Sequence, residues 1–185
     1  MNNDPKCNIF SLKKKTIHTA KLFSIEEVKI DLKNGRKVIH EVVERKPSVC
    51  VLPLTQDYEL YLVSQYRYLL GKTTIEAMAG FVEKDEKPLQ AAKRELKEET
   101  GIDALSWELV TTVESSASVV RATCSIYLAT KLELGDANPD EDEDIEIIKI
   151  PLHEAVQKVI SGEINTVSSM IGILMLDKLR KEKKL

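Results

Sequence analysis

The chain has 185 residues, of which 43% are hydrophobic, and its 27 Lys and Arg against 30 Asp and Glu give a formal net charge of −3. That length fits one domain, or one domain with an additional arm. The charge excludes the basic surface that holds nucleic acid, and no apolar run is long enough to cross a bilayer, so we expect neither a nucleic-acid nor a membrane partner.

The first predicted element is a β-hairpin. Residues 21–32 read as a strand, Asn34-Gly35 is the strongest short hairpin-turn signal, and residues 37–43 form the return strand. Pro47 then breaks the pattern. We therefore divide the chain into an N-terminal arm with its hairpin, residues 1–45, and a main domain, residues 46–185.

Strands and helices are interleaved in the main domain. Strands are predicted over residues 48–54, 60–65, 74–79, 107–113, 123–132 and 145–150, and helices over 88–100, 152–161 and 165–184. This order favours a sheet between helical layers. The expected buried positions of the first and last helices are Leu89, Ala92 and Leu96, and Met170, Ile173, Leu174 and Leu176.

The three cysteines are too widely spaced for a disulfide framework and have no metal-ligand spacing. They are Cys7, Cys50 and Cys124. This usage suits a reducing compartment, and we expect a cytoplasmic protein. Cys50 and Cys124 lie in apolar runs and are expected in the core.

The helix predicted over residues 88–100 stacks carboxylates on one face. Glu95 and Glu99 are four positions apart, one turn above each other, with Glu98 beside them. Like charges at this spacing weaken an isolated helix by roughly 0.2–0.5 kcal/mol per pair. The ordinary interpretation is a solvated Glu- and Lys-rich face. The other is a cation site, and oxygen ligands without His or Cys favour Mg²⁺ or Mn²⁺.

Three residues mark the limits of this segment. Gly80 precedes a loop, where a backbone without Cβ can turn sharply. Pro88 lies at the helix start, where its missing N–H is harmless, and Gly101 follows the last periodic residue, where glycine ends helices. The segment is therefore a loop–helix–loop of defined length.

Residues 80–102 resemble the Nudix box, Gly-x5-Glu-x7-Arg-Glu-(apolar)-x-Glu-Glu-x-Gly-(apolar), and meet all of its constrained positions. The resemblance implies a Nudix-type α/β/α sandwich with a mixed sheet in the main domain. It also implies a hydrolase that uses a divalent metal to cleave a diphosphate linked to a nucleoside or a similar group. Glu95 and Glu99 are then the leading metal ligands, with the backbone carbonyl of Ala79 as a further one.

Three other residues of the box receive supporting roles from the same resemblance. Glu98 is a further ligand or a water-mediated contact. Arg94 orients a glutamate of the box by an ion pair without touching substrate. Glu86 locks the loop, and Arg94 is its expected partner.

Two segments before the box resemble the ADP-ribose pyrophosphatase (ADP-sugar diphosphatase) branch of the family. They are Gln65-Tyr66-Arg67 and Glu76-x-x-Ala79-Gly80, and the resemblance spans roughly residues 20–180. It implies hydrolysis of ADP-ribose to AMP and ribose 5-phosphate, and a homodimer in which the hairpin arm pairs with a second subunit. The alternatives are another nucleotide sugar such as GDP-mannose, and a Nudix fold that binds a nucleotide without catalysis.

Three residues are candidates for substrate binding. Arg67 has a fork of donors suited to a phosphate or a carboxylate, with an ordinary surface arginine as the alternative. Arg45 is a weaker candidate, for which a solvated loop arginine is the alternative. Glu76 is a substrate contact, a buried paired acid or a polar residue at a strand end.

The run of five acids at residues 140–144 is the second informative cluster. Such runs are usually solvated, mutually repelling loops. Members of the branch carry Glu-x-Glu just before a strand that begins with Asp-Ile. Carried over, Glu141 is the general base and Glu143 a metal ligand, while the neighbouring aspartates are alternatives.

The segment after the box departs from the branch. The usual Ser-Pro-Gly turn and the Glu that follows it are absent from residues 114–123, which leaves the identity of the sugar open. Arg121 in this segment either faces an additional phosphate or acidic sugar, or is a solvated loop arginine.

Overall fold

The computed structural model describes residues 7–116, 118–135 and 145–185. The chain divides into two compact units. The first comprises Met1–Lys46 and Glu114–Thr123, and the second comprises Pro47–Val113 and Cys124–Leu185.

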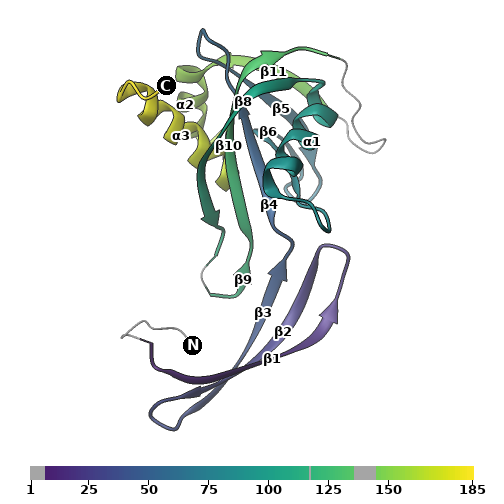
Figure 1. Ribbon diagram of the computed structural model, residues 1–185, viewed down its shortest axis with the longest axis vertical. Coiled ribbons are helices and arrows are strands. Elements are labelled where there is room, and N and C mark those ends of the chain that lie inside the picture. The colour runs from purple at the N-terminus through teal and green to yellow at the C-terminus, as the bar shows by residue number, and fades with distance from the viewer. Residues whose placement is uncertain (1–6, 117, 136–144) are drawn as a thin grey trace. The chain divides into compact units, whose positions relative to one another are not determined.

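The first unit is a four-stranded sheet in the order β1-β2-β3-β9 (Figure 1). Its strands are β1 (Ile9–Thr19), β2 (Phe23–Leu32), β3 (Lys37–Arg45) and the short β9 (Val120–Arg121). The predicted hairpin is confirmed as β2 and β3, which pair antiparallel, and Gly35 takes the positive φ of 84° that its tight turn requires. Strand β1 was not predicted, because its side chains are almost all exposed and show no alternation of apolar and polar residues.

Within the described residues, the second unit contains two sheets and three helices. The first sheet is mixed, in the order β7-β4-β10-β8, with β4 parallel to β10 and antiparallel to β7. The other sheet is antiparallel, in the order β11-β5-β6. The strands are β4 (Ser48–Pro53), β5 (Glu59–Arg67), β6 (Lys72–Glu76), β7 (Met78–Phe81), β8 (Asp103–Glu114), β10 (Thr123–Glu133) and β11 (Ile145–Pro151), and the helices are α1 (Pro88–Thr100), α2 (Leu152–Ile160) and α3 (Val167–Lys181).

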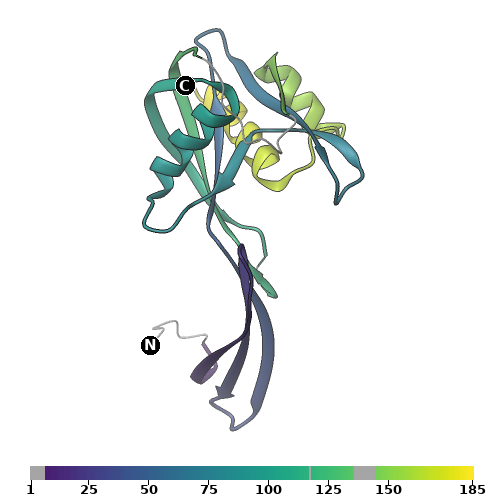
Figure 2. The ribbon, with the colours of Figure 1, turned by 90° about the vertical axis from the view of Figure 1, so that its right-hand side faces the viewer.

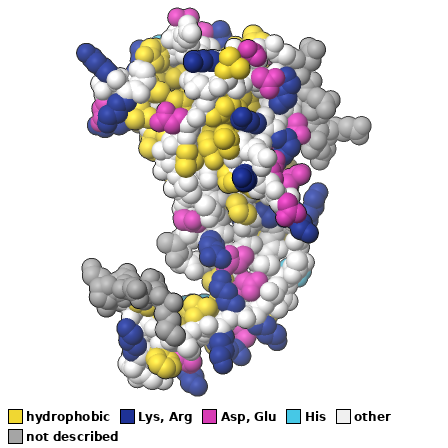
Figure 3. All heavy atoms as spheres, viewed as in Figure 1, with side chains coloured by type: hydrophobic (Ala, Val, Ile, Leu, Met, Phe, Trp, Pro, Cys, Tyr) yellow, Lys and Arg dark blue, Asp and Glu magenta, His cyan; other side chains and the backbone are white. Residues whose placement is uncertain are grey.

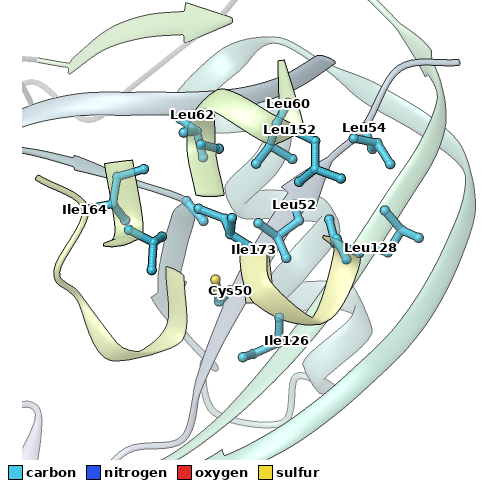
Figure 4. Close-up of a cluster of buried hydrophobic side chains, with 14 of the residues drawn as sticks. Cys50, Leu52, Leu54, Leu60, Leu62, Ile126, Leu128, Leu152, Ile164 and Ile173 are labelled. Atoms are coloured by element: carbon cyan, nitrogen blue, oxygen red, sulfur yellow. The ribbon is translucent and has the colours of Figure 1, made fainter. Parts of the chain in front are cut away.

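Strand β4 shows why this unit is a sandwich. Val49 and Val51 belong to a buried cluster with Ala91, Ala92 and Leu96 of α1. The alternate residues Cys50 and Leu52 belong to a second cluster, drawn in Figure 4, with Leu152, Ile173 and Leu176 of α2 and α3. Because successive strand residues face opposite sides, α1 covers one face of the sheet and α2 and α3 cover the other (Figures 1 and 2). The predicted α/β/α sandwich with a mixed sheet is confirmed.

Two details differ from the sequence-based expectation. The strand predicted over residues 74–79 is two strands, since β6 pairs with β5 and β7 pairs with β4. At the break, the backbone N–H of Ala77 donates to Ser169 Oγ of α3 at 3.0 Å. Leu89 and Leu174, predicted to be buried, are exposed, and Met170 is only partly buried.

Cys50 and Cys124 are buried, as expected. None of the described helices has the length and the apolar character needed to span a membrane.

Candidate active site

Helix α1 begins and ends where the sequence predicts. Pro88 is its first residue, and Gly101 caps its end with a left-handed φ of 71°. The Gly101 N–H donates to the carbonyl of Lys97 at 2.8 Å. These fixed ends set the direction in which the acidic side chains of the helix project.

Arg94 connects the helix to the loop that precedes it. Its Nε and Nη2 donate to the two carboxylate oxygens of Glu86 at 3.0 and 3.2 Å, and Nη2 also donates to the Phe81 carbonyl at 3.0 Å. Its Nη1 donates to Glu95 at 2.8 Å and to Glu98 at 2.9 Å. The expected pairing of Arg94 with Glu86 and with glutamates of the box is observed. One guanidinium therefore holds the loop and offsets the repulsion between two stacked carboxylates.

The charges around Arg94 shift the pKa of both partners of its main contact. The hydrogen bond from Arg94, and then the backbone N–H of Glu83, hold the pKa of Glu86 below its ordinary value of 4.5 despite some desolvation. The hydrogen bond to Glu86, together with the nearby Glu95 and Glu98, raises the pKa of Arg94 above its ordinary value. The contact between loop and helix is thus fully charged at neutral pH.

Gly80 allows Glu95 to approach the backbone. A Cβ built on Gly80 would overlap the Glu95 carboxylate. Gly80 lies within strand β7 and is not among the residues with positive φ. The expected reason for this glycine, a sharp turn, is therefore wrong: the residue is needed because a carboxylate lies against its α-carbon. Glu95 is thereby placed beside the Ala79–Gly80 peptide, to which the predicted carbonyl ligand belongs.

We expect Gly80→Ala to lower turnover at least tenfold, because the added methyl group displaces the Glu95 carboxylate from its place against Gly80. The fold should survive, because the end of a flexible side chain can move aside. Kinetics and thermal unfolding measured together check this. The matched control is Gly162→Ala, since Gly162 lies outside the site. An alanine at this position would be strained by the positive φ of 81°, but its methyl group would meet no neighbouring atom. Normal turnover by Gly80→Ala would show that the position of Glu95 is not critical.

The stacked glutamates differ in burial. Glu99 is 6% exposed, whereas the Glu98 side chain is 43% exposed and accepts from Arg94. A buried carboxylate is stable only where cations or hydrogen-bond donors meet it. A set of carboxylate and carbonyl oxygens without sulfur or nitrogen fits a hard divalent cation.

The described residues include only some of the metal ligands that the resemblance implies. Across residues 7–116, 118–135 and 145–185, no three acidic, His or Cys side chains converge as metal ligands. Glu141 and Glu143 belong to the acidic run at residues 140–144, which lies outside the described residues.

Arg67 and Glu76 contact each other directly. Arg67 Nε and Nη2 donate to the two carboxylate oxygens of Glu76 at 2.9 and 3.1 Å. Glu76 is 6% exposed and also accepts from the hydroxyl of Thr74. Of the three interpretations given for Glu76, the geometry matches the buried, paired acid. Thr74 was missed, since nothing in the sequence distinguishes it from the neighbouring Thr73.

Arg45 and Arg121 lie in the first unit. Arg45 is the exposed last residue of β3, so the expectation that it lies in a loop is wrong. Arg121 is in β9 and donates from Nε to Glu44 at 2.6 Å, and Glu44 also accepts from Lys14 at 2.7 Å. Arg121 is thus an ion-paired strand residue, not a solvated loop arginine. Glu44 and Lys14 were missed because the cluster depends on parallel pairing of β3 with β9.

Comparisons with known proteins agree on the type of domain. A family model described as NUDIX domain matches residues 44–167. An ADP-ribose pyrophosphatase of Bacillus subtilis (strain 168) is 32% identical over 175 residues, covering 90% of this chain and 94% of that protein. A methanol dehydrogenase activator of Bacillus methanolicus is 32% identical over 169 residues, covering 88% and 91%. A crystal structure of an ADP compounds hydrolase superposes with a TM-score of 0.80 at 22% identity over 96% of each chain, which shows a shared fold.

Proposed function

Because the chain belongs to the Nudix family of hydrolases, we propose that it cleaves the diphosphate bond of a nucleoside diphosphate sugar, with ADP-ribose hydrolysed to AMP and ribose 5-phosphate. The observation that carries this proposal is the placement of Glu95. Arg94 holds its carboxylate on one side, and the glycine backbone beside Ala79 admits it on the other. A solvated surface helix has no need of either feature.

We assign the residues the following roles. The carboxylates of Glu95 and Glu99, the carbonyl of Ala79 and the carboxylate of Glu143 would hold Mg²⁺ or Mn²⁺. When bound, such an ion neutralises the diphosphate and acidifies a coordinated water. Glu98 would orient the attacking water by accepting a hydrogen bond from it, and Arg94 keeps Glu95 and Glu98 in position.

The remaining assignments concern proton transfer and substrate binding. Glu141 accepts the proton of the water that attacks phosphorus, and the P–O bond to the departing phosphate oxygen breaks. Arg67 binds a phosphate oxygen, and Arg45 is a further substrate contact. Glu76 acts on the substrate through Arg67, which it holds.

Two observations bear on the choice of substrate. The Bacillus subtilis relative is named for ADP-ribose, which favours this nucleotide sugar. The missing Pro-Gly in residues 114–123 keeps another sugar, such as that of GDP-mannose, as the alternative. The Bacillus methanolicus relative is named as an activator of another enzyme, which makes the regulation of a partner protein the second candidate.

Incubation with a panel of nucleotide sugars and measurement of nucleoside monophosphate release tests the function. Each substrate is assayed with Mg²⁺, with Mn²⁺ and with excess chelator. We expect ADP-ribose to be turned over fastest and the chelator to abolish turnover. Faster release from GDP-mannose would reassign the substrate, and tight nucleotide binding without any turnover would favour the regulator.

We propose that the first unit mediates a homodimer. Its exposed large apolar side chains include those of Phe10, Leu12, Ile17 and Ile39, and Figure 3 shows apolar side chains on the surface of this unit. Large apolar side chains that stay exposed on a unit of this size favour its association with another chain. We expect sedimentation at micromolar concentration to give twice the 20.9 kDa of one chain, and a monomer would contradict the proposal.

We also place the protein in the cytoplasm. All three cysteines are free thiols, which is the usual state in a reducing compartment.

A further inference from the structure

Thr74, Glu76 and Arg67 form a hydrogen-bonded chain on one face of the β5–β6 hairpin. The register pairs Val63 with Glu76, Gln65 with Thr74 and Arg67 with Lys72. Because side chains alternate along a strand, Thr74 and Glu76 share one face of β6, and Arg67 lies on the corresponding face of β5. Arg67 therefore reaches past Thr74 to contact Glu76.

This chain runs from the interior to the surface. Thr74 is 2% exposed and Glu76 is 6% exposed, whereas the Arg67 side chain is 41% exposed. Glu76 Oε1 accepts both from Thr74 and from Arg67 Nε at 2.9 Å, and Oε2 accepts from Arg67 Nη2 at 3.1 Å. A buried carboxylate that accepts from two different side chains cannot rotate without losing at least one of these hydrogen bonds.

The hydroxyl of Thr74 has two acceptors within reach. One is Glu76 Oε1, and the other is the carbonyl of Gln65 at 3.3 Å. A hydroxyl has a single proton, and an ionised carboxylate is the stronger acceptor. The Thr74 hydroxyl therefore donates its proton to Glu76 Oε1.

We propose that Thr74 is a positioning residue for the reaction. By fixing the Glu76 carboxylate, it fixes the plane and direction of the Arg67 guanidinium, which contacts the diphosphate of the substrate. The proposal rests on the proposed function, in which Arg67 binds a phosphate oxygen. A guanidinium held through two of its nitrogens is oriented in advance, so less conformational freedom is lost when it meets a phosphate.

Packing alone does not account for a threonine at this position. Valine has nearly the same shape and is likewise favoured in strands, and it would fill a buried strand position without a polar atom. What threonine adds is the hydroxyl, and that hydroxyl donates to Glu76.

The test compares Thr74→Val with Thr73→Val and Thr74→Ser. Thr73 is the neighbouring exposed residue and pairs with Tyr66, so it lies on the opposite face and its replacement is the matched control. We expect Thr74→Val to lower kcat/KM for ADP-ribose roughly tenfold, the effect of losing one hydrogen bond to a charged group. Thr73→Val should leave kcat/KM unchanged, and Thr74→Ser, which keeps the hydroxyl, should stay within about twofold of the wild type.

A double-mutant cycle separates positioning from a structural role. Arg67→Lys keeps the positive charge but removes the fork, so Thr74→Val should have no further effect on kcat/KM in that background. If Thr74→Val lowered kcat/KM equally in the wild type and in Arg67→Lys, or did not lower it at all, the positioning role of Thr74 would be overturned. The proposed function would be untouched by either result. A wild-type chain that turns over no nucleotide sugar would overturn the proposed function as well. Thermal unfolding is followed throughout, and Thr74→Cys, with a weaker donor of similar size, replaces the valine variant if that variant does not fold.

Discussion

We expect Glu99→Gln to lower kcat for ADP-ribose on the order of a thousandfold, equivalent to about 4 kcal/mol of transition-state stabilisation. Glutamine has nearly the same shape as glutamate, but the substitution replaces a charged carboxylate with a neutral amide at a residue that is only 6% exposed. A hard divalent cation is held mainly by ionised oxygen ligands, so the loss of one charge weakens the site directly.

Turnover and Mn²⁺ affinity, measured by calorimetry on the same preparations, check this prediction. Glu108→Gln is the matched control, because Glu108 is an exposed residue of β8 outside the proposed machinery. The control should match the wild type in both measurements. Near-normal turnover by Glu99→Gln would remove Glu99 from the metal site.

We expect Arg94→Lys to lower both activity and stability. Lysine keeps the charge, but it cannot donate at once to Glu86, Glu95, Glu98 and the Phe81 carbonyl. We expect kcat to fall about a hundredfold and the free energy of unfolding to fall by about 1–3 kcal/mol.

The effect of Arg94→Lys on stability should depend on pH. Arg94 lowers the pKa of Glu86 below its ordinary value of 4.5. The stability from this pair is therefore present above the unfolded-state pKa and is lost as the pH falls through the folded-state pKa. We expect the difference in the free energy of unfolding between wild type and Arg94→Lys to be smaller at acid pH than at neutral pH. The control is Arg36→Lys, since Arg36 lies in the exposed hairpin turn. Equal stability of Arg94→Lys and wild type at neutral pH would contradict the role of Arg94.

Local chemical signals made α1 and its acidic face predictable. Pro88 and Gly101 mark its ends within the sequence itself, and the spacing of Glu95 and Glu99 sets the face they share. The pairing of Glu86 with Arg94 followed from the resemblance to the box, and the structure contains it.

Features that depend on contacts distant in sequence were not predictable. The approach of Glu95 to Gly80 depends on how α1 packs against β7, so the sequence suggested a turn instead. The break between β6 and β7 at Ala77 arises because the two strands pair in different sheets, β6 with β5 and β7 with β4. The ion pair of Arg121 with Glu44 joins residues 77 positions apart, and β1 is held by backbone pairing without a buried face.

We propose that α1 and the Ala79 carbonyl together hold a divalent cation against a diphosphate. Crystals grown with Mn²⁺ and a non-hydrolysable analogue of ADP-ribose test it through the anomalous signal of the metal. We predict a signal between the analogue's diphosphate and the carboxylates of Glu95 and Glu99, with the Ala79 carbonyl oxygen among the ligands. A fully bound analogue with no metal at that place, and with both carboxylates turned to bulk solvent, would contradict the account.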